Sequence, residues 1–136
     1  MNILIVDDEP VSRVKLGKLL LAYGNCATAE DGPSALCQFG FAFGIGKPFD
    51  LIAMDIEMPG LRGQDVVKAI RNWETRISIE HPMEYPVVQN VKIVMVTASG
   101  DMNAVTSSYR QLCDDYIVKP VTPENVRAAL VRMGLA

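Results

Sequence analysis

The most informative stretch of the sequence is Asp50-Leu51-Ile52-Ala53-Met54-Asp55, in which four apolar residues stand between two acids. The chain then turns through Met58-Pro59-Gly60. A short apolar run that ends at a Pro-Gly breaker is typical of a buried strand in a parallel sheet. We therefore expect Asp55 to lie on the rim of that sheet. A carboxylate held there could be a nucleophile, a metal ligand or a helix cap, and this stretch alone leaves the three roles open.

The bulk composition narrows the class of protein. The chain has 136 residues, of which 49% are hydrophobic and 21% charged, and this predicts one globular domain with a real core. A net charge of -3 argues against a nucleic-acid surface. No apolar run approaches the ~18–20 residues of a membrane span, and no signal peptide is visible. The widely spaced Cys26, Cys37 and Cys113 predict reduced, buried thiols in a cytoplasmic protein.

Strand and helix patterns alternate along the whole chain. The expected strands are Ile3–Val6, Asn25–Ala29, Leu51–Met54, Val91–Val96 and Asp115–Lys119. The expected helices begin near Pro10, Gly32, Gly60, Asp101 and Thr122. Five strands that alternate with five helices predict an α/β fold, a doubly wound parallel sheet with helices on both faces.

Several local patterns add detail to this outline. Four apolar residues recur at helical spacing in the first helix, namely Val11, Val14, Leu19 and Leu20. We expect four aromatic side chains to pack in the core, namely Phe39, Phe41, Phe43 and Trp73. Thr122 is the expected N-cap of the last helix, which follows it with Pro123. Residues 75–90 show little periodicity and predict an extended loop, either functional or an insertion.

Polar residues stand where the predicted strands end. Ligands of open parallel sheets bind beyond the carboxyl ends of the strands. The residues at those ends are Asp7, Asp8, Asp55, Thr97 and Lys119. Acids are common as caps at helix N-termini, and that interpretation would suit Asp7 and Asp8 if they stood alone. Capping does not explain why all five strand-end residues are polar.

The chemistry of this set favours a phosphoryl group. Two carboxylates ~5 Å apart repel each other by about 3 kcal/mol at an effective dielectric of 20, so the cluster needs a cation or raised pKa values. Oxygen ligands in an open site suit Mg²⁺. Together with the Lys119 ammonium and the Thr97 hydroxyl, Mg²⁺ would form a clamp for phosphoryl oxygens. The carboxylate between them is the natural acceptor, which would give an aspartyl phosphate.

Five motifs then occur in order from end to end. They are Val6-Asp7-Asp8-Glu9-Pro10, Asp31-Gly32, Leu51-Ile52-Ala53-Met54-Asp55 with Met58-Pro59-Gly60, Val96-Thr97-Ala98 and Asp115-Tyr116-Ile117-Val118-Lys119-Pro120. With these motifs the chain resembles a receiver domain of a two-component response regulator. The resemblance implies a flavodoxin-like sheet with strand order 2-1-3-4-5 and a role in phosphorelay signalling.

The same resemblance implies the roles of the site residues. Asp55 would accept the phosphoryl group from a histidine kinase or a histidine phosphotransfer protein. The Mg²⁺ ligands would be Asp7, Asp8, Asp55 and the backbone carbonyl of Glu57. Lys119 would pair with the phosphoryl oxygens.

The resemblance also implies a switch. The Thr97 hydroxyl would move onto the phosphoryl group, and Tyr116 would turn inward behind it. This movement would reshape the surface made by the helix expected at Asp101–Leu112, the strand Asp115–Lys119 and the final helix, to which a downstream effector would bind.

The sequence also bears on the wider organisation of the protein. We expect residues 1–136 to form a single receiver domain without an output domain, since none follows Gly134. Such a module would catalyse its own phosphorylation and dephosphorylation but turn over no independent substrate. We expect no direct contact with nucleic acid or membrane. The sequence leaves open the cognate kinase, the effector and whether the chain is a monomer or a homodimer.

Two other classes of protein share part of this chemistry. Haloacid-dehalogenase-like phosphohydrolases also use Mg²⁺, an Asp nucleophile, a Ser/Thr and a Lys, but their nucleophile lies on the first strand in an Asp-x-Asp pattern. Here the acidic pair comes first, and Glu57 follows Asp55 at the second position. A flavin-binding module would need a phosphate loop after the first strand. The acids Asp7-Asp8-Glu9 would repel a phosphate there.

Overall fold

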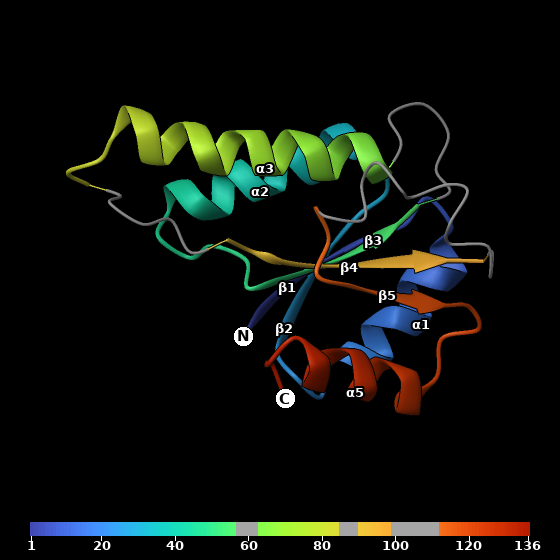
Figure 1. Cartoon of the computed structure of the whole chain (residues 1–136). Coiled ribbons are helices and arrows are strands. Elements are labelled where there is room, and N and C mark those ends of the chain that lie inside the picture. Colours follow the sequence, from blue (N-terminus) through green and yellow to red (C-terminus); the bar gives the residue numbers. More distant parts are fainter. Residues whose placement is uncertain (57–62, 85–89, 99–111) are drawn as a thin grey trace.

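The computed structural model describes residues 1–56, 63–84, 90–98 and 112–136. These residues form a parallel sheet of five strands in the order β2-β1-β3-β4-β5 (Figure 1). The strands are β1 (Asn2–Val6), β2 (Asn25–Ala29), β3 (Leu51–Asp55), β4 (Lys92–Thr97) and β5 (Asp115–Val118). The helices are α1 (Pro10–Leu20), α2 (Gly32–Gly44), α3 (Gly63–Glu80) and α5 (Pro123–Arg132). The predicted class, parallel sheet and strand order are confirmed.

Alternation along the strands divides the core into two layers. Leu4 of β1 and Ile52 of β3 face α2 and α3, whereas their neighbours Ile3 and Leu51 face α1 and α5. Figure 1 shows the two helix pairs on opposite faces of the sheet. Successive side chains of a strand point to opposite faces, and a sheet covered on both sides therefore needs near-continuous apolar strands. The three central strands β1, β3 and β4 meet this need.

Local capping sets where the helices start. The Asp31 side chain accepts a hydrogen bond from the Ser34 backbone N–H at 2.8 Å and caps α2. The predicted N-cap Thr122 is confirmed, and Asn125 completes a reciprocal capping box with it at 2.8 and 3.1 Å. Such caps satisfy backbone N–H groups that have no partner inside the helix.

The apolar side of α1 that packs against the sheet is not the one that the sequence predicted. Val11 and Val14 are 73% and 57% exposed, while Leu16 and Leu20 are buried. The helix buries the side that carries Leu16 and Leu20, and at 3.6 residues per turn Val11 and Val14 lie on the opposite side. Arg13 is half-buried, and its guanidinium donates a 2.8 Å hydrogen bond to the Asp7 carbonyl.

The predicted extended loop at 75–90 is wrong for residues 75–80, which continue α3 to Glu80. Local contacts support these turns: the Thr75 hydroxyl donates to the Arg71 carbonyl at 3.1 Å, and Arg76 lies 4.0 Å from Glu80. Ile79 is 72% exposed in this part of the helix, which explains why the apolar period is lost. The remainder of the predicted loop lies partly at 85–89, outside the described residues.

Other expectations are corrected in part. None of the three cysteines, all of them in the described ranges, forms a disulfide, but none is fully buried: Cys37 is exposed, and Cys26 and Cys113 are half-buried. Phe39 and Phe43 pack edge-on against Trp73, with ring centroids 5.4 and 4.6 Å away, whereas Phe41 is 70% exposed. The helix predicted at Asp101–Leu112 falls almost entirely within 99–111, outside the described residues. Within the described chain, no helix combines the length and apolarity that a membrane crossing requires.

Candidate functional site

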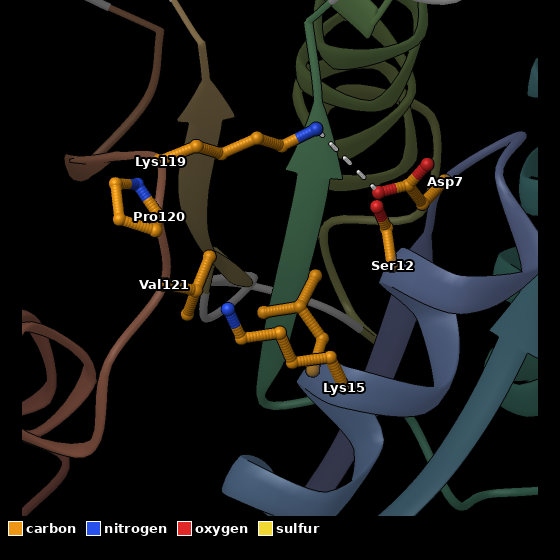
Figure 2. A pocket seen from close by; sticks show the side chains of 7 residues that line it. Asp7, Ser12, Lys15, Lys119, Pro120 and Val121 are labelled. Atoms are coloured by element: carbon orange, nitrogen blue, oxygen red, sulfur yellow. Dashed lines mark ion pairs between the residues drawn. The ribbon is translucent and has the colours of Figure 1, made fainter.

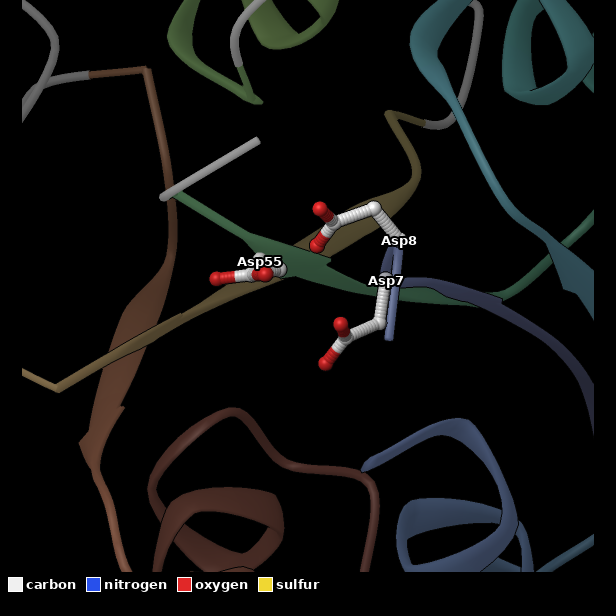
Figure 3. Close-up of side chains that lie close together, drawn as sticks. All are labelled: Asp7, Asp8 and Asp55. Carbon is white, nitrogen blue, oxygen red and sulfur yellow. The ribbon is translucent and has the colours of Figure 1, made fainter. Parts of the chain in front are cut away.

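Three carboxylates converge at the carboxyl edge of the sheet. Asp7 and Asp8 directly follow β1, and Asp55 is the last residue of β3, its neighbour in the sheet. Each side chain offers an oxygen, and these oxygens all lie within 4.8 Å of one another. Figure 3 shows the three side chains around one space above the strand ends. The structure thus brings together the acids that the sequence placed at separate strand ends.

The cluster is buried on one side and open on the other. Asp7 and Asp55 are 0% and 2% exposed, whereas Asp8 is exposed to solvent. Lys119, just after β5, directs its Nζ to 3.7 Å from Asp55 Oδ1 and 3.9 Å from Asp7 Oδ2. Figure 2 shows the lysine reaching across toward Asp7. One ammonium therefore faces two buried carboxylates, and it cannot neutralise both.

Asp7 shows the electrostatic strain most clearly. Burial raises the pKa of its carboxyl to about 6, and the neighbouring Asp55 charge adds to this rise. The Glu9 backbone N–H, which donates to Oδ1 at 2.9 Å, and the Lys119 charge oppose it. Of the described side chains, Asp7 supplies the one buried polar atom without a hydrogen bond, its Oδ2. A buried carboxylate oxygen without a hydrogen bond destabilises the fold unless a cation binds to it.

The donor set fits Mg²⁺. All three side chains offer oxygens, which hard divalent cations prefer, and the exposed Asp8 leaves one side open to the water molecules that Mg²⁺ usually retains. The Oδ2 of Asp7, which accepts no hydrogen bond, is an acceptor that such an ion would satisfy. The predicted carbonyl ligand from Glu57 lies outside the described residues.

The two predicted switch residues lie on the neighbouring strands. Thr97 ends β4 and is 3% exposed, and its carbonyl accepts a 2.7 Å hydrogen bond from the Lys119 backbone N–H. Tyr116 lies in β5, half-buried against the core layer that contains Met95. The backbone bond ties the Thr97 and Lys119 strand ends together. Thr97 and Lys119 are thereby held on the same rim as the acids.

Sequence reasoning missed Gly63, which begins α3 beside the site. A Cβ at this position would lie 2.4 Å from the Asp55 carbonyl oxygen and 3.1 Å from Met54 Cγ. Real Cβ atoms do not approach a backbone oxygen so closely, so only glycine allows α3 to start against the end of β3. The available signal was a glycine at the start of a helical pattern, just after a Pro-Gly turn.

A partly buried ion network at the opposite end of the sheet was also missed. The Arg71 guanidinium donates to Glu74, to the carbonyls of Leu112 and Val91, and to Asp114, at 2.7 to 3.0 Å. Glu74 is 4% exposed and accepts the Val91 N–H at 2.8 Å. The network joins α3 to the starts of β4 and β5. In the sequence, Arg71 and Glu74 look like ordinary surface charges on a helix.

Comparison with known proteins gives a consistent result. The family model for the response regulator receiver domain matches residues 3–131. The sensor histidine kinase GacS of Pseudomonas protegens is 32% identical over 99% of this chain, which spans only 13% of that protein. The chemotaxis protein CheY of Pseudomonas aeruginosa is 28% identical over 98% of this chain and 95% of its own length.

A solved structure agrees with the fold. The response regulator protein TrrA of Thermotoga maritima, solved in complex with Mg²⁺ and BeF, is 30% identical to this chain. The superposition has a TM-score of 0.72 and covers 99% of this chain and 98% of TrrA. The likeness therefore extends over the whole sheet and its strand ends.

Proposed function

Because the chain belongs to the response regulator receiver domain family, we propose that Asp55 is the residue that accepts the phosphoryl group. The family makes the chain a signalling module of a two-component system, and the haloacid-dehalogenase-like alternative finds no support. The observation that carries the assignment is the position of Asp55. Asp55 ends the central strand β3, between β1, which leads to Asp7 and Asp8, and β4, and its carboxylate lies both in the acidic cluster and 3.7 Å from the Lys119 ammonium.

The proposed step is a transfer from a phosphohistidine. An Asp55 carboxylate oxygen attacks phosphorus, a P–O bond forms, and the P–N bond to the imidazole breaks with the electron pair going to nitrogen. Lys119 stabilises the charge that develops on the phosphoryl oxygens, as it already lies 3.7 Å from the acceptor carboxylate. The Asp7 carboxylate is held in place beside the acceptor by the hydrogen bond that it accepts from the Glu9 N–H.

We propose Mg²⁺ as the cofactor, held by Asp7, Asp8, Asp55 and the Glu57 carbonyl. When bound, the ion supplies positive charge that neutralises carboxylate and phosphoryl oxygens. Support comes from the oxygen-only donor set, from the buried Asp7 Oδ2 and from the Mg²⁺–BeF complex of TrrA.

We further propose that Thr97 and Tyr116 carry the response away from the site. The buried Thr97 side chain lies at the end of β4, and the half-buried Tyr116 lies on the adjacent strand. A phosphoryl group on Asp55 would attract the Thr97 hydroxyl, and Tyr116 would follow into the vacated space. The surface that would change includes β5, α5 and the helix predicted at Asp101–Leu112.

The partners follow from the family and stay proposals. The donor would be a histidine kinase or a histidine phosphotransfer protein, and a downstream effector would read the changed surface. Receiver domains are signalling domains rather than classical enzymes, so we propose stoichiometric labelling without steady turnover. A cytoplasmic location stays a prediction from the sequence.

Intact-mass spectrometry tests this function. Incubation with acetyl phosphate and Mg²⁺ should add one phosphoryl group per chain, and chelation of Mg²⁺ should prevent it. The Asp55→Asn variant should stay unlabelled. Labelling of that variant to the same extent, or continuous hydrolysis of a simple phosphate ester by the wild-type chain, would contradict the proposal.

A further inference from the structure

Helix α2 presents a large apolar surface to solvent. Phe41 is 70% exposed and Ile45, its C-cap residue, is 54% exposed. Pro33 and Cys37 are also exposed, and the four residues follow one another at intervals of four. Residues four apart lie on the same side of a helix, so they form one continuous row. We call this row, from Pro33 to Ile45, the α2 face.

The α2 face differs from the other exposed helix surfaces in its charge. Of the four described helices, α2 alone contains no charged residue. The exposed valines of α1, by contrast, are interspersed with Arg13 and Lys15, and Val131 of α5 adjoins Arg132. An exposed apolar patch free of charge is a feature of interaction surfaces.

The charges at the two ends of the α2 face are of opposite sign. The exposed acids Glu30 and Asp31 precede the helix, and the exposed base Lys47 follows it. The row is symmetric about position 39, which lies midway between Cys37 and Phe41, between Pro33 and Ile45, and between Asp31 and Lys47. A two-fold axis at this position would therefore place each residue opposite its complement in an antiparallel copy.

We propose that two copies of this chain associate through antiparallel packing of their α2 faces. Phe41 of each copy covers Cys37 of the other, Ile45 covers Pro33, and each Lys47 pairs with the acids Glu30 and Asp31 across the axis. Two chains of net charge -3 repel each other, and an uncharged contact face with complementary ends keeps this repulsion low.

The size of the face sets the strength of the pairing. A helix of 13 residues is about 20 Å long and, at a width of about 10–12 Å, its face covers a few hundred Å². Stable interfaces bury about 800 Å² on each partner. The contact is therefore below standard size, and we expect a reversible dimer that forms at high micromolar rather than nanomolar concentration.

Sedimentation velocity over a concentration series tests the proposal on the full chain. The wild type should show a reversible monomer–dimer equilibrium, and Phe41→Ser should raise its dissociation constant at least tenfold. Phe41 is exposed, so this change should leave the fold intact. Val131→Ser on α5 is the matched control, since Val131 is 52% exposed, and it should leave the equilibrium unchanged.

Charge exchange tests the antiparallel geometry. Lys47→Glu alone should weaken the dimer, because it puts acids opposite acids. The double variant Glu30→Lys/Lys47→Glu should restore much of the loss. A wild-type chain that stays monomeric up to about 1 mM would overturn the proposal. So would a dimer that Val131→Ser disrupts and Phe41→Ser does not, since it would use another face.

Discussion

The ammonium nitrogen of Lys119 lies 3.7 Å from Oδ1 of Asp55, although Asp55 ends β3 and Lys119 follows β5, with β4 between them. The lysine side chain thus crosses the end of an intervening strand to reach the central acid. It also lies 3.9 Å from Asp7 and is the cation that the described structure places against both buried carboxylates. Two buried carboxylates against one ammonium leave net negative charge at the site, which suits a divalent cation.

The first prediction concerns this lysine. Lys119→Met should lower the rate of phosphoryl uptake from acetyl phosphate by about 10²-fold, because it removes a fixed charge from the developing phosphoryl oxygens. Quenched time courses followed by intact-mass spectrometry would measure the rate. Lys68→Met, an exposed lysine of α3, is the matched control and should react like the wild type. Equal rates for the two variants would argue against a role for Lys119 in the transfer.

The second prediction concerns the pH dependence of stability. The pKa of Asp7 rises from 3.8 to about 6 on folding, so the folded state binds the proton more tightly. The resulting stabilisation is complete below pH 3.8 and is lost as the pH rises through 6. The Asp7→Asn variant does not lose this stabilisation, because the asparagine side chain does not ionise. Without Mg²⁺, the variant should gain up to about 3 kcal/mol over the wild type at pH 7 and little at pH 4, by urea denaturation.

Addition of Mg²⁺ at pH 7 should make the wild type more stable than Asp7→Asn. The ion binds the folded wild type and stabilises it by mass action, whereas the Asn variant has lost one anionic ligand. A denaturation midpoint of Asp7→Asn that rises with Mg²⁺ as much as that of the wild type would contradict the assignment of Asp7 as a ligand.

The third prediction concerns Gly63. Gly63→Ala should destabilise the chain by about 1–3 kcal/mol, because the added Cβ would lie 2.4 Å from the Asp55 carbonyl and α3 would have to move. Gly17→Ala in α1 is the matched control: its Cβ would meet Ile5 at an ordinary 4.0 Å and should stabilise the helix by roughly 0.5–1 kcal/mol. Chemical denaturation should give opposite signs for the two variants; a shared sign would refute the packing argument.

The fourth prediction compares two ion pairs of α3. Glu74→Ala should cost about 1–3 kcal/mol, since it leaves the buried Val91 N–H without an acceptor and takes from Arg71 one of its two carboxylates. Glu80→Ala breaks only the exposed pair with Arg76 and should cost less than about 0.5 kcal/mol. Thermal and urea unfolding of both variants would show the difference. Similar losses would mean that burial does not govern these pairs.

The sheet and the acid cluster could be predicted from the sequence because both depend on short-range patterns. Apolar runs indicated the strands, and the shared direction of parallel strands meant that their polar ends must meet. Asp7, Asp55 and Lys119 could therefore be placed on one rim from the order of the residues alone. The wider family resemblance added the roles that these residues are proposed to play.

The remaining features depend on contacts between distant segments. Val11 and Val14 satisfy a helical period, yet the side of α1 that packs against the sheet is the one that carries Leu16 and Leu20. Arg71 looks like a surface residue until the segment near Leu112 folds against it. The need for glycine at position 63 becomes clear only from the close approach of α3 to the Asp55 carbonyl. Periodicity along the sequence cannot predict such contacts, because they join segments that are far apart in the chain.

The most direct test of the account is to locate the phosphoryl group. The chain would be labelled with acetyl phosphate and Mg²⁺, reduced with borohydride to convert an acyl phosphate to homoserine, digested and sequenced by tandem mass spectrometry. We expect homoserine at position 55, absent from the unlabelled chain and from Asp55→Asn. Homoserine at Asp7 or Asp8 instead, or an unmodified Asp55 in a fully labelled chain, would contradict it.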